Sequence, residues 1–238
     1  AAWVRKIDNV LTGSVIARTS PTNNDRFFLL LINSQGSIDF TINRNGSTPL
    51  SGSACGPTEA SGVVINSLNF VVGRYNLTHA SIFINGTQVA TSACAFSNIN
   101  VTAWQDSEPT LIGSQEDAVF PFNGTIDEVM IFNRSLSAEQ IFALYQNKTN
   151  IIVAQETIKD ENWTVEATPN NGTGDGTFVT SNNVTILNTK AVISSLVLNT
   201  TNLALNDTSV NLTAYVTTSD VDNDSVKVIY NWLRNNTP

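Results

Sequence analysis

Apolar and polar residues alternate in short runs along most of the 238-residue chain. An alternation with a period of two places every second side chain on one face, which is typical of a half-buried β-strand. Such runs span residues 26–32, 37–42, 68–75, 81–84, 126–132, 164–167, 178–187, 210–216 and 226–232. Gly, Asn, Ser and Asp residues separate the runs and favour turns between them. The pattern predicts an all-β protein.

One stretch departs from this period and predicts a single short helix. Ser137 is suited to cap the amino end of a helix, and Gln140 completes an S-x-x-Q capping box. Ile141, Leu144 and Tyr145 then form one apolar face of the helix.

The two cysteines of the chain flank a predicted β-meander. Between them lies the pair Asn85-Gly86, which suits the two-residue type I′ turn of a hairpin. A disulfide between Cys55 and Cys94 would join the two ends of the meander and would indicate an exported protein. Two separately buried thiols are the alternative.

The chain is rich in N-x-S/T acceptors for N-glycosylation. Fifteen sequons occur, at Asn45, Asn76, Asn85, Asn100, Asn123, Asn133, Asn147, Asn162, Asn171, Asn183, Asn199, Asn206, Asn211, Asn223 and Asn235. Composition alone would give roughly six. The excess predicts a glycoprotein, with accidental matches in an Asn-rich surface as the alternative. Several sequons have an apolar middle residue, which on a strand would point into the core.

Charge and hydropathy exclude several classes of protein. The net charge of −8 and the pI of about 4.5 make a nucleic-acid surface improbable. No run approaches 18 apolar residues, so we expect no membrane insertion in this segment. The opening AAWVRK lacks the apolar region of a signal peptide, which predicts a mature piece or an excerpt of a longer protein.

The adjacent carboxylates of Asp127 and Glu128 are the first candidates for catalysis. On a strand, neighbouring side chains point to opposite faces, so the pair cannot act together on one substrate atom. His79 is the only histidine, and it lacks the second histidine or the nucleophile that a metal site or a catalytic triad requires. We expect no catalytic residue.

Two weaker patterns concern ligands. Asp220, Asp222 and Asp224 have a D-x-D-x-D spacing that can direct alternate oxygens at Ca²⁺, but of the two interpretations we favour a solvated acidic turn. Calcium is the only cofactor that we consider. Trp104 is a candidate for stacking on a sugar, whereas a tryptophan in a sandwich more often belongs to the core.

The segment FNGTIDEVMIFNRSLSAEQIFALYQ, residues 122–146, resembles the closing signature of laminin G-like domains, which are jelly rolls of the concanavalin A type. LNFVVGRYNLTHASIFINGTQVA resembles the central strand and hairpin of the same family, and AAWVRK resembles one of its inner strands. The resemblance implies that residues 1–149 are a jelly roll lacking its first strands. It also implies that Asp127 is a buried or half-buried hydrogen-bonding residue that orders adjoining loops, with a ligand contact as the alternative. The E-x-D-x-x-E run of related glycosidases is not present.

The remaining sequence resembles the immunoglobulin-like repeats of large prokaryotic, especially archaeal, surface proteins. ENWTVEATPNNGTGDGTFVTSNNVTIL resembles the last hairpin of such a repeat, and SVNLTAYVTTSDVDNDSVKVIYNWLRNNTP resembles the first strands of the next one. The resemblance implies closing strands in residues 150–190 and opening strands in residues 191–238. Each part is only a portion of a sandwich, so a neighbouring copy or a longer chain would have to cover it.

These observations favour a non-enzymatic, glycosylated extracellular protein that builds a cell-surface filament, sheath or adhesin. Its expected partners are other copies of itself, other surface proteins and glycans. The alternative is a lectin-like carbohydrate-binding module of a larger secreted protein or enzyme, because the jelly-roll fold hosts both roles.

Overall fold

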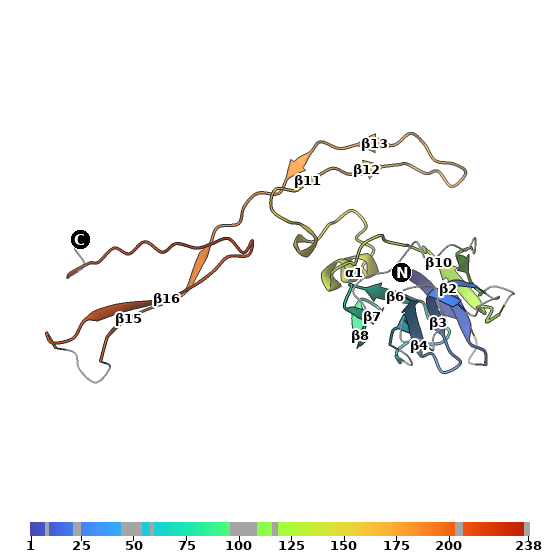
Figure 1. Ribbon diagram of the computed structural model, residues 1–238. Helices are drawn as coiled ribbons and strands as arrows, with labels where there is room; N and C mark the ends of the chain where they lie inside the picture. Colours follow the sequence, from blue (N-terminus) through green and yellow to red (C-terminus); the bar gives the residue numbers. More distant parts are fainter. Residues whose placement is uncertain are drawn as a thin grey trace. The chain divides into compact units, whose positions relative to one another are not determined.

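The computed structural model describes residues 1–7, 10–20, 25–43, 54–57, 60–95, 109–115, 119–202 and 207–235 (Figure 1). The chain divides into two compact units, Ala1–Glu156 and Thr157–Pro238. The predicted all-β class with one short helix is confirmed.

The first unit is a sandwich of two five-stranded sheets in which neighbouring strands are antiparallel. One sheet contains, in spatial order, β10 (Gly124–Asp127), β1 (Ala2–Lys6), β6 (Asn69–Tyr75), β7 (His79–Ile84) and β8 (Thr87–Ala93). The other contains β5 (Ala54–Cys55), β4 (Ile38–Asn43), β3 (Asp25–Ile32), β2 (Gly13–Ser20) and β9 (Leu111–Ile112). Strands β3, β4, β6 and β7 confirm the first four predicted runs of this unit.

The alternation along the strands builds an apolar layer between the two sheets. Val4 of β1 and Ile82 of β7 enter it from one side, and Val15 of β2 and Ile32 of β3 enter it from the other, all fully buried. Burial of these side chains is the main force that holds the sheets together.

Gly73 of β6 lets the two sheets approach closely. A Cβ atom at this position would lie 2.3 Å from Cδ2 of Phe40, so the ring of Phe40 packs directly on the bare backbone of β6. A larger residue at position 73 would push β4 away from β6.

Helix α1 (Ala138–Tyr145) begins as predicted, because Ser137 Oγ accepts a hydrogen bond from Gln140 N at 3.1 Å. The capping box was also expected to include a hydrogen bond from Ser137 N to the Gln140 side chain, and this part of the prediction is wrong. The Gln140 side chain instead donates to Ile151 O and accepts from Val153 N, while Ser137 N donates to Glu156. These bonds hold the chain after the helix, including η4 (Ala154–Glu156), against α1.

The helix packs on the outer face of the first sheet. Ile141 and Leu144 contact a buried cluster that contains Phe70 and Val72 of β6 and Phe83 of β7. The first sheet is therefore covered on both faces, which explains why β6 reads as a nearly continuous apolar run.

The hairpin between β7 and β8 confirms the predicted turn. Ile84 pairs with Thr87, and Asn85 and Gly86 between them have φ values of 51° and 80°. Positive φ at both positions is the signature of a type I′ turn. Asn85 Oδ1 also accepts a hydrogen bond from Phe70 N at 2.9 Å, which fastens the turn to β6.

The run 126–132 forms a strand only as far as Asp127, so the longer predicted strand is wrong. Glu128 has a φ of 47°, in the left-handed region, and this breaks the extended line. Asp127 Oδ1 accepts a hydrogen bond from Glu128 N at 2.8 Å and stabilises the break. Beyond it, Met130 and Ala1 exchange two backbone hydrogen bonds of 2.8 Å.

The second unit consists of antiparallel two-stranded ribbons. β11 (Asn162–Trp163) pairs with β14 (Val184–Thr185), β12 (Glu166–Ala167) pairs with β13 (Val179–Thr180), and β15 (Val192–Thr200) pairs with β16 (Leu212–Ser219). The runs predicted at 164–167 and 178–187 are therefore shorter than expected. Strand β16 confirms the run at 210–216, whereas residues 226–232 are not a strand.

The apolar side chains of these ribbons do not enter a core. Val165 is 64% exposed. Val184, the middle residue of a sequon, is 53% exposed, against the prediction that such a residue points into the core. The same is true of Leu212, the middle residue of a sequon, which is 56% exposed. The alternating sequence is present, but among the described residues no second layer covers it.

Candidate ligand cavity

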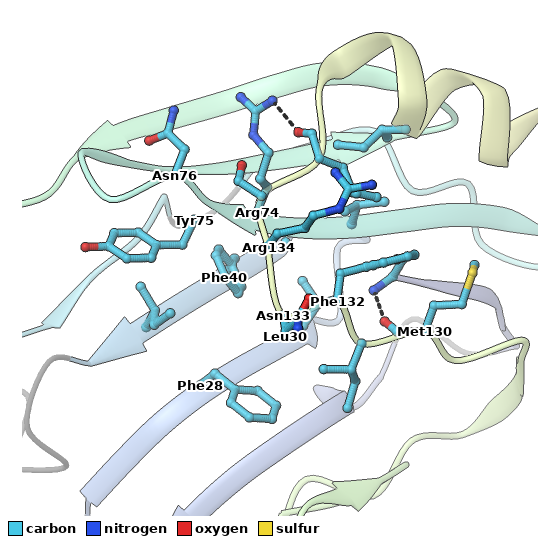
Figure 2. A pocket seen from close by; sticks show the side chains of 18 of the residues that line it. Phe28, Leu30, Phe40, Arg74, Tyr75, Asn76, Met130, Phe132, Asn133 and Arg134 are labelled. Carbon is cyan, nitrogen blue, oxygen red and sulfur yellow. Dashed lines mark hydrogen bonds between the residues drawn. The ribbon is translucent and has the colours of Figure 1, made fainter. Parts of the chain in front are cut away.

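A cavity of about 810 Å³ opens between the two sheets of the first unit (Figure 2). Phe28 and Leu30 of β3 and Phe40 of β4 project into it from the second sheet. The opposite wall is formed by β6 around Gly73 and by residues 130–136, which leave the sheet after the break at Glu128. The segment that follows the break thus forms one side of the cavity.

Two hydrogen bonds hold the Arg74 side chain in the cavity wall (Figure 2). Its Nη1 donates to Leu136 O and its Nη2 donates to Gln88 Oε1, both at 3.2 Å. The guanidinium carbon lies 4.7 Å from the centroid of the Phe83 ring. Burial lowers the pKa of Arg74, and the negative charge of Glu139 offsets part of this effect.

The other polar groups of the cavity lie near its rim. The hydroxyl of Tyr75 donates to Leu77 O at 3.1 Å. Arg134, with 42% of its side chain exposed, forms an ion pair with Glu156. Asn133 is exposed beside it. The cavity therefore combines an apolar floor that contains aromatic rings with a rim of amide, hydroxyl and guanidinium groups, as small-molecule sites do.

In a chain that begins at Ala1, the α-amino group of this residue also lines the cavity. It donates to Met130 O at 2.8 Å, and burial lowers its pKa from the ordinary 8.0 to about 6. A buried ammonium group carries a desolvation cost that the neutral amine avoids.

The stability of a chain with a free amino group at Ala1 should therefore depend on pH. The folded state binds fewer protons than the unfolded state between pH 6 and 8, so the free energy of unfolding should rise with pH across this window, by about 2 to 3 kcal/mol in total. The gain is complete above pH 8 and absent below pH 6. Urea unfolding at several pH values measures it. An acetylated amino terminus should flatten this rise, and an equal slope in both forms would contradict the assignment to Ala1.

The disulfide predicted between Cys55 and Cys94 is confirmed, with a Cα–Cα distance of 5.4 Å. Cys55 lies in β5 and Cys94 follows β8, which are the edge strands of the two sheets. The bond thus joins the two layers of the sandwich at one edge.

The carboxylates of Asp127 and Glu128 do not converge on a ligand. Asp127 is exposed, against the expectation of a buried or half-buried residue, and its carboxylate accepts a hydrogen bond from the backbone N–H of Glu128. His79 lies exposed at the start of β7, and its Nδ1 is 3.0 Å from Thr78 Oγ1. Neither place lies in the cavity wall.

The three aspartates considered for calcium have different partners. Asp220 Oδ1 accepts from the backbone of Asp222 and Asp224, Asp222 Oδ2 accepts from Thr189 N, and Asp224 binds Lys159 at 2.6 Å. The hydrogen bond to Asp224 is the largest cause that raises the pKa of Lys159. Within the described ranges no three His, Cys, Asp or Glu side chains form a group that could hold a metal ion. The segment is thus a hydrogen-bonded acidic turn, and calcium binding stays a prediction.

Most sequon asparagines of the described chain lie at the surface. Exposed sites are Asn76, Asn123, Asn133, Asn147, Asn162, Asn171, Asn183, Asn211, Asn223 and Asn235, and Asn85 and Asn199 are half-buried. Asn45, Asn100 and Asn206 lie outside the described residues, as does Trp104. Glycosylation and the sugar contact at Trp104 therefore stay predictions.

Sequence reasoning missed the cavity. Its walls come from β3, β4, β6 and the segment 130–136, which are distant in sequence and meet only in the folded sandwich. The glycine within the apolar run of β6 was a usable signal, because a glycine inside a strand often marks a close approach of another chain segment.

The structure describes no helix long and apolar enough to span a membrane. The first unit is instead a two-layer antiparallel sandwich with a ligand-sized cavity between its layers. This is the architecture of the family whose model matches residues 1–142, described as the concanavalin A-like lectin/glucanases superfamily. The chain belongs to this superfamily, and the predicted jelly roll is confirmed at that level.

Several solved structures are similar to the chain. The CBM40 of the Ruminococcus gnavus IT-sialidase bound to α2,3 sialyllactose is 18% identical, with a TM-score of 0.49 over 60% of this chain and 79% of that chain. The leech intramolecular trans-sialidase is 18% identical, with a TM-score of 0.46 over 70% of this chain and 26% of that one. The binding domain of botulinum neurotoxin DC in complex with rat synaptotagmin II is 17% identical, with a TM-score of 0.40 over 93% and 55%. A search of curated proteins finds no match.

Proposed function

We propose that the chain is a lectin-like carbohydrate-binding module of a larger extracellular protein and that it acts without catalysis. The observation that carries this proposal is the cavity of the concanavalin A-like sandwich, with its aromatic floor and polar rim. A sugar offers hydroxyl groups for hydrogen bonds and apolar C–H faces for aromatic rings, so both parts of the cavity match its chemistry.

Phe132 is the ring best placed to test sugar binding. It lines the cavity and is 43% exposed, so its replacement leaves the buried core intact. We expect Phe132→Ala to weaken binding to the preferred sugars on a glycan array at least about fivefold, because one stacked ring is worth about a kilocalorie per mole or more.

Phe142→Ala is the matched control. Phe142 is 44% exposed in the same unit and does not line the cavity. The control should bind sugars as the unchanged protein does. Absence of selective sugar binding by the unchanged protein would refute the proposal, and so would an equal loss in both variants.

An extracellular location is supported by the disulfide and by the excess of sequons. Glycans on the exposed asparagines would shield the open sheet edges and limit aggregation through them. Surface contacts would then occupy the regions without sequons.

The structure distinguishes one sequon from the others. The amide of Asn85 accepts from Phe70 N, and its turn packs on α1, since a Cβ at Gly86 would lie 2.7 Å from the Phe142 ring. We expect glycopeptide mass spectrometry of the folded protein, exposed to a glycosylating enzyme, to find Asn183 occupied and Asn85 largely bare. Equal occupancy at the two sites would contradict this expectation. If the protein from its native source carried no glycan at all, the prediction that it is a glycoprotein would be wrong.

A second candidate function is a structural or adhesive building block of a cell-surface filament, sheath or adhesin. The specific observation in its favour is the exposed apolar surface of the ribbons in the second unit. In this proposal residues 150–190 and 191–238 are parts of two immunoglobulin-like sandwiches that partners complete. Other copies of the chain or other surface proteins would be the partners.

A further inference from the structure

Two of the predicted glycosylation sites lie in the wall of the cavity. Among the sequon asparagines of the described chain, Asn76 and Asn133 line it, and both side chains are exposed (Figure 2). A residue that lines a cavity and also faces solvent lies at the mouth of that cavity. Sugars attached at these positions would therefore stand where a ligand enters.

Asn76 begins the tight turn that leads from β6 to β7, and the turn orients its side chain. The backbone N of Asn76 donates to His79 O at 3.1 Å. In return, Asn76 Oδ1 accepts from His79 N at 2.8 Å and from Thr78 Oγ1 at 3.1 Å. The amide oxygen is thus held toward the turn. The amide nitrogen Nδ2, which is the atom that carries a glycan, points out of the turn and donates to none of the described residues.

The same turn is fastened to the sandwich at two places. Cys94 N donates to Thr78 O at 2.7 Å, and Cys94 itself forms the disulfide with Cys55. The Tyr75 hydroxyl donates to Leu77 O at 3.1 Å. The base of a glycan on Asn76 would therefore be fixed beside the mouth of the cavity.

We propose that a glycan on Asn76 closes the cavity and thereby regulates carbohydrate binding by this chain. The proposal rests on the proposed lectin-like function and names the regulation of that same cavity. Asn76 Nδ2 forms a bond to the anomeric carbon of a phosphate-activated oligosaccharide, which a glycosyltransferase supplies. Nδ2 gives up one proton, and the phosphate leaves with the electron pair of the broken carbon–oxygen bond.

Closure follows from the tether. A glycan that is linked to the mouth and fits the cavity competes with free sugars at an effective concentration of about 1 mM. If free sugars bind with a dissociation constant of about 0.1 mM, this competition weakens their binding about tenfold. A glycan that does not fit the cavity still fills the space through which a free sugar enters.

The test compares full chains with and without a glycan on Asn76. All of them carry Ser135→Ala, which removes the sequon of Asn133, so that the comparison concerns one site. In the parent chain from a glycosylating secretory host, glycopeptide mass spectrometry should find Asn76 occupied. Thr78→Ala removes the sequon and leaves Asn76 in place. We expect this variant to bind the sugars preferred on the glycan array at least about tenfold more tightly than the glycosylated parent.

Thr149→Ala is the control for the loss of a glycan elsewhere. It removes the sequon of Asn147, which is exposed in the same unit and does not line the cavity, so sugar binding should stay as weak as in the parent. The parent and Thr78→Ala produced without glycosylation should bind sugars equally, which excludes a direct effect of Thr78.

Three results would overturn the proposed regulation. These are a bare Asn76 in the parent from the glycosylating host, equal sugar binding by that parent and Thr78→Ala, or a gain in Thr78→Ala that is equally large without glycans. The chains without glycans also separate the two proposals. If they bind sugars and the glycan changes nothing, only the regulation is refuted, whereas absence of sugar binding in these chains refutes the lectin-like function as well.

Discussion

Replacement of Cys55 and Cys94 together by serine should lower the free energy of unfolding of the first unit by about 4 kcal/mol. The bond closes a loop with a sequence separation of 39 residues, and its removal restores that conformational freedom to the unfolded chain. It also releases β5 and β8 at the edges of the two sheets. Urea unfolding of the oxidised protein and of the double serine variant measures the difference.

A reducing agent provides the control for the disulfide. It should destabilise the unchanged protein to the level of the double variant and should leave the double variant unaffected. A loss below about 1 kcal/mol in the double variant would contradict the prediction. It would indicate that the unfolded chain without the disulfide keeps residual structure that limits its conformational freedom.

The elements that sequence reasoning predicted correctly are those with local causes. The turn at Asn85-Gly86 forms because both residues accept positive φ, and helix α1 begins at Ser137 because its hydroxyl accepts the Gln140 N–H. Alternation placed β3, β4, β6 and β7 because each strand has a buried side within the sandwich. The two cysteines were paired correctly because they bracket one meander.

The errors arise where tertiary contacts override a local pattern. Residues 128–132 alternate like a strand, yet the left-handed Glu128 turns them away to line the cavity. Gln140 was expected to complete a capping box, but Glu156, distant in sequence, takes the Ser137 N–H.

The cavity itself could not be read from the sequence. Phe28 and Phe40 look like ordinary inward residues of two strands, and nothing in their runs shows that the opposite wall leaves a gap. A void depends on how two layers fail to fill the space between them, which is a property of packing and not of periodicity.

Phe70→Ala should be the most damaging substitution in the outer layer of the first unit. The Phe70 side chain is fully buried, with its ring centroid 5.1 Å from that of Trp3 and 6.4 Å from that of Tyr145 on α1. Its removal leaves a cavity that β6 and the helix cannot both fill. We expect a loss of about 3 to 5 kcal/mol in the free energy of unfolding. Urea unfolding followed by tryptophan fluorescence measures it, since Trp3 lies beside the lost ring.

Phe142→Ala is the control for this prediction. It distinguishes the effect of losing the helix-docking cluster from the effect of removing an aromatic ring in general. Phe142 lies on the same helix, but it is 44% exposed, so its removal should cost less than about 1 kcal/mol. If both variants lost the same stability, the cluster around Phe70 would not be what fastens α1 to the sheet. The segment 130–136 leads from the break at Glu128 into α1 and forms a wall of the cavity. Loss of helix docking in Phe70→Ala should therefore also weaken any sugar binding, although Phe70 does not line the cavity.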